Sequence, residues 1–200
     1  MKFKVKNAEF YLSFTFFSVI LMLLCIGKFE ICLFSLIASL LHEAIHIFCI
    51  ISLGGNISKL TLTGFGANIV RGERSLPDFK EAIISFSAPL FNLILALVLS
   101  NEMPYFATVN FIMGLFNLLP YYDFDGGRGL SYILKYFIST KKINILLDVL
   151  SVTVTALFVF LGVYIFFKHR RNITIILIGC YMIIRFFIRL KPNVNKSYNY

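Results

Sequence analysis

Apolar segments about as long as a membrane-spanning helix recur along almost the whole chain. Hydrophobic residues make up 58% of the 200 residues and charged residues only 14%, which excludes an ordinary soluble domain. A helix of roughly 20 apolar residues crosses the hydrocarbon core of a bilayer. The sequence therefore predicts an integral membrane protein, surrounded by lipid, with about six spans. The expected spans are 9–27, 31–53, 82–100, 104–119, 144–167 and 172–190.

The net charge of +9 does not indicate a nucleic-acid-binding protein, because the basic residues follow a membrane topology. With a cytoplasmic N-terminus, fifteen Lys and Arg residues fall on the inner side of the membrane and four on the outer side. The positive-inside rule therefore predicts that both termini are cytoplasmic. Contact with anionic lipids explains the excess of positive charge. The four outer residues are Lys28, Lys168, Arg170 and Arg171.

Two segments interrupt the helical pattern of a single polytopic membrane domain, expected at 1–191 with a polar tail at 192–200. Alternating residues around a Gly-Phe-Gly turn predict a short β-hairpin at 60–70. The sequence N-L-L-P-Y-Y-D-F-D-G-G-R at 117–128 contains a proline and a Gly-Gly pair. These residues predict a break at the end of the fourth helix and a tight turn. The expected fold class is an all-α integral membrane protein with a short β-hairpin and a broken fourth helix.

The sequence H-E-A-I-H begins at His42, inside the second apolar segment. His42 and His46 are four residues apart, so they lie on one face of a helix and can bind the same zinc ion. Glu43 is rotated by about 100° around the helix. From there it can reach a water molecule at the zinc and act as general base and then general acid. The simpler interpretation is a set of polar residues hydrogen-bonded in a helix bundle, but ionisable groups in a membrane helix usually mark a functional site.

A hydrolytic zinc site generally takes three protein ligands and leaves one position for water. Asp123 and Asp125 lie in the broken segment, where a carboxylate can turn back toward the helix bundle. Both are also compatible with a solvated turn. The other acidic candidates are Glu73 and Glu81 in the polar connection before the third helix, Glu102 on the outer side of the membrane and Asp148 at the start of the fifth span. The third ligand is therefore not decided by spacing alone.

The two motifs together resemble the site-2 protease family of intramembrane zinc metalloproteases. That family pairs H-E-x-x-H in one transmembrane helix with N-x-x-P-x-x-x-x-D-G in a later one, and the chain has Asn117, Pro120 and Asp125 followed by Gly126 at the matching positions. The resemblance covers about residues 31–130, the expected core of the domain. It implies a protease whose substrates are transmembrane proteins.

The resemblance also implies a role for each matching residue. Glu43 is implied to be the catalytic acid and base. Asn117 and Pro120 are implied to contribute to substrate binding, although a lone asparagine in a membrane helix commonly joins two helices. Asp123 stays a rival of Asp125, because the family often has a proline at position 123. The implied zinc ligands are His42, His46 and Asp125.

A third likeness to the family is S-A-P-L-F-N at 87–92, with Ala88 where glycine is usual. Pro89 and Asn92 are expected to shape the third core helix rather than to take part in catalysis. Among the members of this family, the chain resembles the short, sporulation-type branch. This resemblance implies regulated intramembrane proteolysis and a membrane regulatory partner. Two alternatives stay open: a membrane zinc peptidase that cuts soluble or surface-exposed peptides, and a noncatalytic membrane binding or regulatory protein. The intact Glu43 favours an enzyme, because a metal scaffold needs no base.

Overall fold

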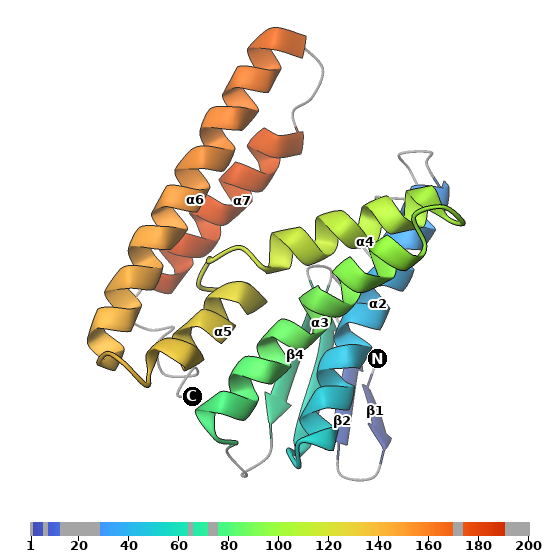
Figure 1. Ribbon diagram of the computed structural model, residues 1–200, viewed down its shortest axis with the longest axis vertical. Helices are drawn as coiled ribbons and strands as arrows, with labels where there is room; N and C mark the ends of the chain where they lie inside the picture. Colours follow the sequence, from blue (N-terminus) through green and yellow to red (C-terminus); the bar gives the residue numbers. More distant parts are fainter. Residues whose placement is uncertain are drawn as a thin grey trace. The chain divides into compact units, whose positions relative to one another are not determined.

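A computed structural model describes six helices and four strands of the chain (Figure 1). The chain divides into two compact units. The first unit contains the described residues up to Leu119 together with Asp123–Phe137, and the second contains Pro120–Tyr122 and the described residues from Ile138 onward. The H-E-A-I-H motif and Asp125 both belong to the first unit. The described residues are 2–5, 8–12, 29–63, 66–71, 76–169 and 174–190.

Three helices of the first unit pack against one another and form its core (Figure 1). Gly114 lies where even a methyl group would come within 2.8 Å of the Pro89 carbonyl oxygen. The Phe34 and Phe106 rings are in contact at 5.6 Å between centroids. Small residues and tight contacts of this kind are what hold helices together inside a membrane. The three helices are α2 (Phe29–Ser52), α3 (Asp78–Val98) and α4 (Pro104–Asn117).

The described residues include three helices that are long and apolar enough to cross a membrane, namely α2, α3 and α6 (Thr140–His169). Many of their large apolar side chains are exposed, as expected of surfaces that face lipid. The helices α4, with 14 residues, and α7 (Thr174–Leu190), with 17 residues, are shorter than the roughly 20 residues of a full span. Because three of the described helices are long and apolar enough to cross a bilayer, the chain is a membrane protein. Its six described helices match the expected number, but fewer of them are full-length spans.

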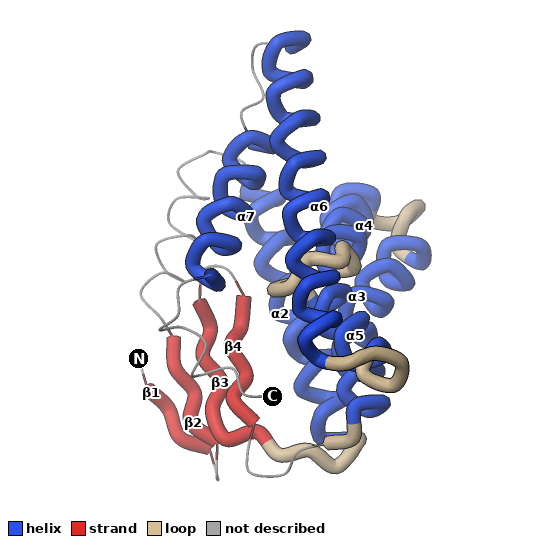
Figure 2. The backbone as a smooth tube through the Cα atoms, turned by 90° about the vertical axis from the view of Figure 1, so that its left-hand side faces the viewer, coloured by secondary structure: helices blue, strands red, loops and turns tan. Residues whose placement is uncertain are grey.

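Four strands form one sheet in the order β1-β2-β3-β4 (Figure 2). β3 and β4 pair antiparallel, with Leu60 opposite Ile69. This confirms the hairpin predicted at 60–70 and lengthens it at both ends. β2 pairs in parallel with β3, so β4 is an edge strand within the described part of the chain. The strands are β1 (Lys2–Val5), β2 (Ala8–Leu12), β3 (Ile57–Thr63) and β4 (Gly66–Arg71).

The predicted first span at 9–27 is wrong at its beginning, because residues 8–12 form strand β2. The alternating sequence Lys-Phe-Lys-Val at 2–5 is a strand pattern that extends toward this region. An isolated hairpin is only marginally stable, and the two N-terminal strands give β3 and β4 a larger sheet. Residues 13–28 of the predicted span lie outside the described residues.

The fourth helix is broken, as predicted. Helix α4 ends at Asn117, and a non-helical segment separates it from α5 (Asp125–Leu134). The tight turn predicted at Gly126-Gly127 is wrong, because both glycines lie in the first turn of α5. Gly126 has a packing role instead, since a Cβ atom there would overlap the backbone carbonyl of Leu118. Glycine therefore lets α5 begin directly against the end of α4.

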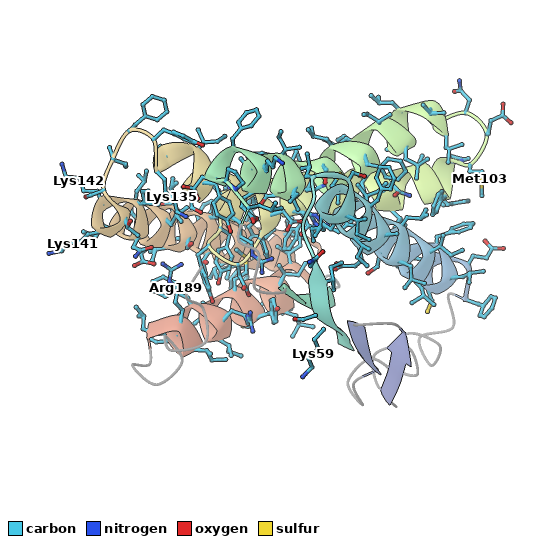
Figure 3. All side chains as sticks on the ribbon, turned by 90° about the horizontal axis from the view of Figure 1, so that it is seen from below. Lys59, Met103, Lys135, Lys141, Lys142 and Arg189 are labelled. Carbon is cyan, nitrogen blue, oxygen red and sulfur yellow. The ribbon has the colours of Figure 1, made fainter. Side chains whose placement is uncertain are left out.

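The second unit is built around helices α6 and α7, which pack against each other. The Tyr121 hydroxyl donates a hydrogen bond of 2.7 Å to the Met182 carbonyl oxygen, which ties the residues after Pro120 to α7. Lys141 and Lys142, near the start of α6, are exposed and project away from the ribbon (Figure 3). Two adjacent lysines at a helix end suit the water-facing boundary of a membrane span.

Candidate metal centre

His42 and His46 lie one turn apart on the buried face of α2. The two residues are only 6% and 8% exposed, and their rings meet edge to face at 4.9 Å between centroids. Both imidazoles point toward the side of α2 where Ile84 of α3 and Asp125 of α5 lie. Polar groups buried in this way need partners, because burial without them costs free energy.

Asp125, the first residue of α5, joins the two histidines. Its Oδ2 atom lies 3.0 Å from His42 Nε2 and 3.1 Å from His46 Nε2, and the three ligand atoms lie within 4.8 Å of one another. In a tetrahedral zinc site with bonds of about 2.0–2.1 Å, neighbouring ligand atoms are about 3.3 Å apart. The two nitrogen–oxygen distances are thus close to those that a zinc ion requires.

The hydrogen bonds around His46 indicate why a cation belongs in this group. Its Nδ1 atom donates to the carbonyl oxygen of Ile84 at 3.0 Å. Because a carbonyl oxygen only accepts, the proton of a neutral ring is on Nδ1, and Nε2 carries a lone pair. That lone pair faces a carboxylate oxygen of Asp125, which is also an acceptor. Two acceptors at this distance need a proton or a metal ion between them, so the residues fit a metal ion.

The other carboxylates considered as third ligand are not part of this cluster. Asp123 Oδ1 lies 3.8 Å from a guanidinium nitrogen of Arg128 in the first unit. Glu81 is buried in the first turn of α3 but does not belong to the cluster of metal-ligating atoms in the described ranges. Glu73 lies outside the described residues. Among the candidates that the structure describes, Asp125 alone meets the two histidines.

The remaining predicted site residues are not members of the His42–His46–Asp125 group. Glu43 is half-buried, and its negative charge acts on the imidazole of His46. Asn117 ends α4, where its Nδ2 atom donates to the Met113 carbonyl oxygen at 3.0 Å and its side-chain oxygen stays an acceptor. Pro120 lies in the non-helical segment between α4 and α5. The catalytic and substrate-binding roles of these residues stay predictions.

Sequence reasoning missed one contributor to the site, the backbone carbonyl of Ile84. It orients His46 through the hydrogen bond to Nδ1, and a partner of this kind fixes the ring and tautomer of a metal-binding histidine. A backbone carbonyl leaves no side-chain signal in a sequence.

Comparison with known proteins adds one finding. No protein-family model and no curated protein matches the chain. A solved structure does match: the site-2 protease from Methanocaldococcus jannaschii, with a TM-score of 0.67 and 20% sequence identity, over 91% of this chain and 91% of that chain. The chain has the fold of a site-2 protease. In this site-2 protease fold, His42 and Asp125 are 83 residues apart in the sequence and meet in one buried cluster.

Proposed function

We propose that the chain is an intramembrane zinc metalloprotease, which hydrolyses a peptide bond in or near a transmembrane segment of another membrane protein. The observation that carries this proposal is the buried His-His-Asp group, two members of which lie on a helix able to cross a membrane. Ionisable groups are costly at that depth and usually mark a functional site. The site-2 protease fold and the H-E-x-x-H motif further support a hydrolase.

In the proposed reaction, His42, His46 and Asp125 hold the zinc ion. When bound, zinc would act as a Lewis acid that polarises the scissile carbonyl group and activates a water molecule. Glu43 takes a proton from the water as it attacks the carbonyl carbon, and passes the proton to the amide nitrogen as the carbon–nitrogen bond breaks. A half-buried carboxylate suits this work, because it must reach both the buried ligands and the incoming substrate.

A substrate helix hides its amide groups in internal hydrogen bonds, so it must unwind before it can be cut. The unwound segment then needs new backbone partners. The edge strand β4 can provide them by pairing with the substrate as an added strand. Asn117 and Pro120 are proposed to contact the same unwound segment near the end of α4, a role that the resemblance to the family supports.

Proline substitutions along β4 should weaken cleavage while zinc stays bound. In an antiparallel pair, alternate residues direct their N–H groups to the partner strand and to the outer edge. Within 67–70, prolines at the two outward positions should lower the cleavage rate about three- to tenfold, the equivalent of one lost backbone hydrogen bond. Prolines at the two inward positions should also disrupt pairing with β3. Initial rates and zinc content of the four variants test this pattern.

Alanine at positions 68, 69 and 70 is the matched control, because alanine keeps the N–H group, and position 67 is alanine in the wild type. Lys4→Pro on β1 provides a second control at the opposite edge of the sheet. Both controls should cleave at the wild-type rate. Equal rates for all four proline variants and wild type would remove strand addition from the mechanism without affecting the proposed metal centre.

The charges at the two ends of the first unit support a proposed orientation in the membrane. The Asn101-Glu102-Met103 turn carries no Lys or Arg, whereas Lys135 lies at the end of α5, and Figure 3 shows Met103 and Lys135 far apart. The positive-inside rule therefore supports a multi-pass protein with Lys135 on the cytoplasmic side and both termini in the cytoplasm. We further propose one polytopic domain at 1–191 and a membrane regulatory partner.

Metal removal provides the direct test of the proposed function. The detergent-purified chain should cut at least one member of a panel of single-span membrane proteins. A zinc chelator should stop the cleavage, and added zinc should restore it, because the carbonyl and the water are both activated at the metal. Gel analysis of the fragments, with mass spectrometry of the new termini, gives the rate and the cut site. Cleavage that persists after complete metal removal would contradict the proposal.

Two other functions are separated by the same assay. A membrane zinc peptidase of different specificity would cut soluble or surface-exposed peptides in preference to membrane segments. A noncatalytic binding or regulatory protein would bind zinc and cut nothing in the panel. The position of His42 and His46 within a candidate membrane span favours the intramembrane protease, because a site at that depth meets membrane helices first.

A further inference from the structure

A polar side chain of helix α3 lies buried without a hydrogen-bond partner among the described residues. Asn92, in the middle of α3, is 0% exposed. Within the described part of the chain, neither its Nδ2 nor its Oδ1 atom has a hydrogen-bond partner. Buried polar groups are nearly always hydrogen-bonded, and each exception needs a reason.

His42 also has a buried polar atom that lacks a hydrogen-bond partner among the described residues. Its Nε2 atom faces Asp125, but its buried Nδ1 atom has no partner among the described residues. In His46 the equivalent Nδ1 atom is bonded to the Ile84 carbonyl oxygen. To offer a lone pair at Nε2 to a metal ion, a neutral His42 must carry its proton on Nδ1, and that buried N–H group needs an acceptor.

The register of α2 and α3 brings Asn92 to within about one helical turn of this nitrogen. The two helices run antiparallel, because His46 bonds to Ile84 while Leu53, later in the chain, bonds to Lys80, which is earlier in α3. His46 meets Ile84, so His42, one turn earlier in α2, is level with Ala88, one turn later in α3. Asn92 is one further turn along α3, about 5.4 Å away.

The direction of the side chains shortens this separation. Side chains on a helix lean toward its N-terminus. In an antiparallel pair, His42 therefore leans toward the level of Asn92, and Asn92 leans toward the level of His42. One water molecule that makes two hydrogen bonds of about 2.8 Å at its roughly tetrahedral angle spans about 4.5 Å, which is shorter than one helical turn and suits a separation reduced by the lean of both side chains.

We propose that Asn92 positions His42 through one buried water molecule. The His42 Nδ1–H group donates to the water, and the water donates to the Asn92 Oδ1 atom. This link fixes the tautomer and the ring orientation that leave Nε2 free for the metal. Asn92 is thus a positioning residue and does not touch the substrate. The inference rests on the proposed zinc site and extends it beyond the three ligands and the Ile84 carbonyl.

Asn110 offers a matched control on the neighbouring helix. It is also 0% exposed, and its Oδ1 atom also has no partner within the described residues. Its Nδ2 atom, however, donates at 2.9 Å to the carbonyl oxygen of Phe106. The side chain therefore leans toward the start of α4, while Gly126 and the metal centre lie against the end of α4, near Leu118.

The test compares zinc affinity in Asn92→Leu and Asn110→Leu, measured by chelator competition on the full chain in detergent. Zinc affinity should fall about 10- to 100-fold in Asn92→Leu, as is usual when the support of a metal-binding histidine is removed. It should be unchanged in Asn110→Leu. Thermal unfolding of the metal-free proteins provides a second readout. There both variants should still unfold cooperatively, which separates a loss of zinc affinity from a loss of the fold.

Wild-type zinc affinity in Asn92→Leu, or an equal loss in Asn110→Leu, would overturn the inference. Asn92→Asp keeps an acceptor at the same place and should bind zinc at least as tightly as wild type. This variant decides the matter if Asn92→Leu does not fold, since a loss of affinity in Asn92→Asp would also overturn the inference. Failure of the wild-type chain to bind zinc at all would instead remove the proposed function on which the inference rests.

Discussion

Replacing Glu43 with glutamine should abolish proteolysis while zinc still binds. Glutamine keeps the size of the side chain and one hydrogen-bonding oxygen, but it takes up no proton from the attacking water. General acid–base catalysis contributes about 10²–10⁴-fold, so the cleavage rate should fall at least about a hundredfold. Zinc affinity should change little, because Glu43 is not part of the ligand cluster. Fragment formation from a single-span substrate and zinc content measured on the same preparation provide the two readouts.

Glu30→Gln is the matched control for this experiment. Glu30 is exposed in the first turn of the same helix, three turns from the metal centre, and its replacement should leave the cleavage rate at the wild-type value. A Glu43→Gln variant that cleaves at the wild-type rate would exclude Glu43 as the proton carrier. A variant that loses its zinc would show that Glu43 supports the metal rather than the reaction.

The histidine pair could be placed from the sequence because its geometry is local. A spacing of four residues on a helix puts two side chains on one face whatever the rest of the fold does, and the apolar surroundings of His42 and His46 predict a buried helix. The structure brings the same two rings together at 4.9 Å. The break after Asn117 was equally local, since proline does not continue a regular helix.

The third member of the cluster shows where local reasoning ends. Asp123 and Asp125 are two residues apart, and both lie in the segment that was expected to turn back. What separates them is the start of α5, which carries Asp125 to α2 and leaves Asp123 near Arg128. The start of that helix depends on the close approach of Gly126 to Leu118. This is a tertiary contact, and its effect does not follow from the spacing of two acidic residues.

The sheet shows the same limit of local reasoning for residues that are far apart in the sequence. The hairpin of β3 and β4 was predictable because turn and alternation lie in one stretch of sequence. The parallel pairing of β2 with β3 joins Phe10 to Leu60 across about fifty residues, and apolar residues near 9–12 suit a membrane helix as well as a strand. Short apolar runs do not distinguish the two by periodicity alone. Residues 8–12 form a strand rather than a helix because β3 is available as their partner strand.

Asp125→Ala should cause the largest loss of zinc affinity among single carboxylate variants. Two imidazoles and one carboxylate hold the ion in the proposed site, so the variant removes one of three ligands and the only negative charge of the cluster. Loss of an outer-shell partner alone typically costs 10–100-fold in metal affinity, so removal of a direct ligand should cost more than about 100-fold. Chelator competition on the detergent-purified chain measures the change, and proteolysis should be lost in parallel.

Asp123→Ala and Glu81→Ala are the decisive controls, because both carboxylates were candidates for the same role. Neither belongs to the cluster in the described residues, so both variants should bind zinc as the wild type does. A loss of zinc in Glu81→Ala with retention in Asp125→Ala would point to a peptidase with a different third ligand. Retention in all three variants would mean that His42 and His46 hold the metal without any of these carboxylates. The 3.0 Å and 3.1 Å contacts of Asp125 argue against both of these outcomes, because they place its oxygen where a third ligand must be.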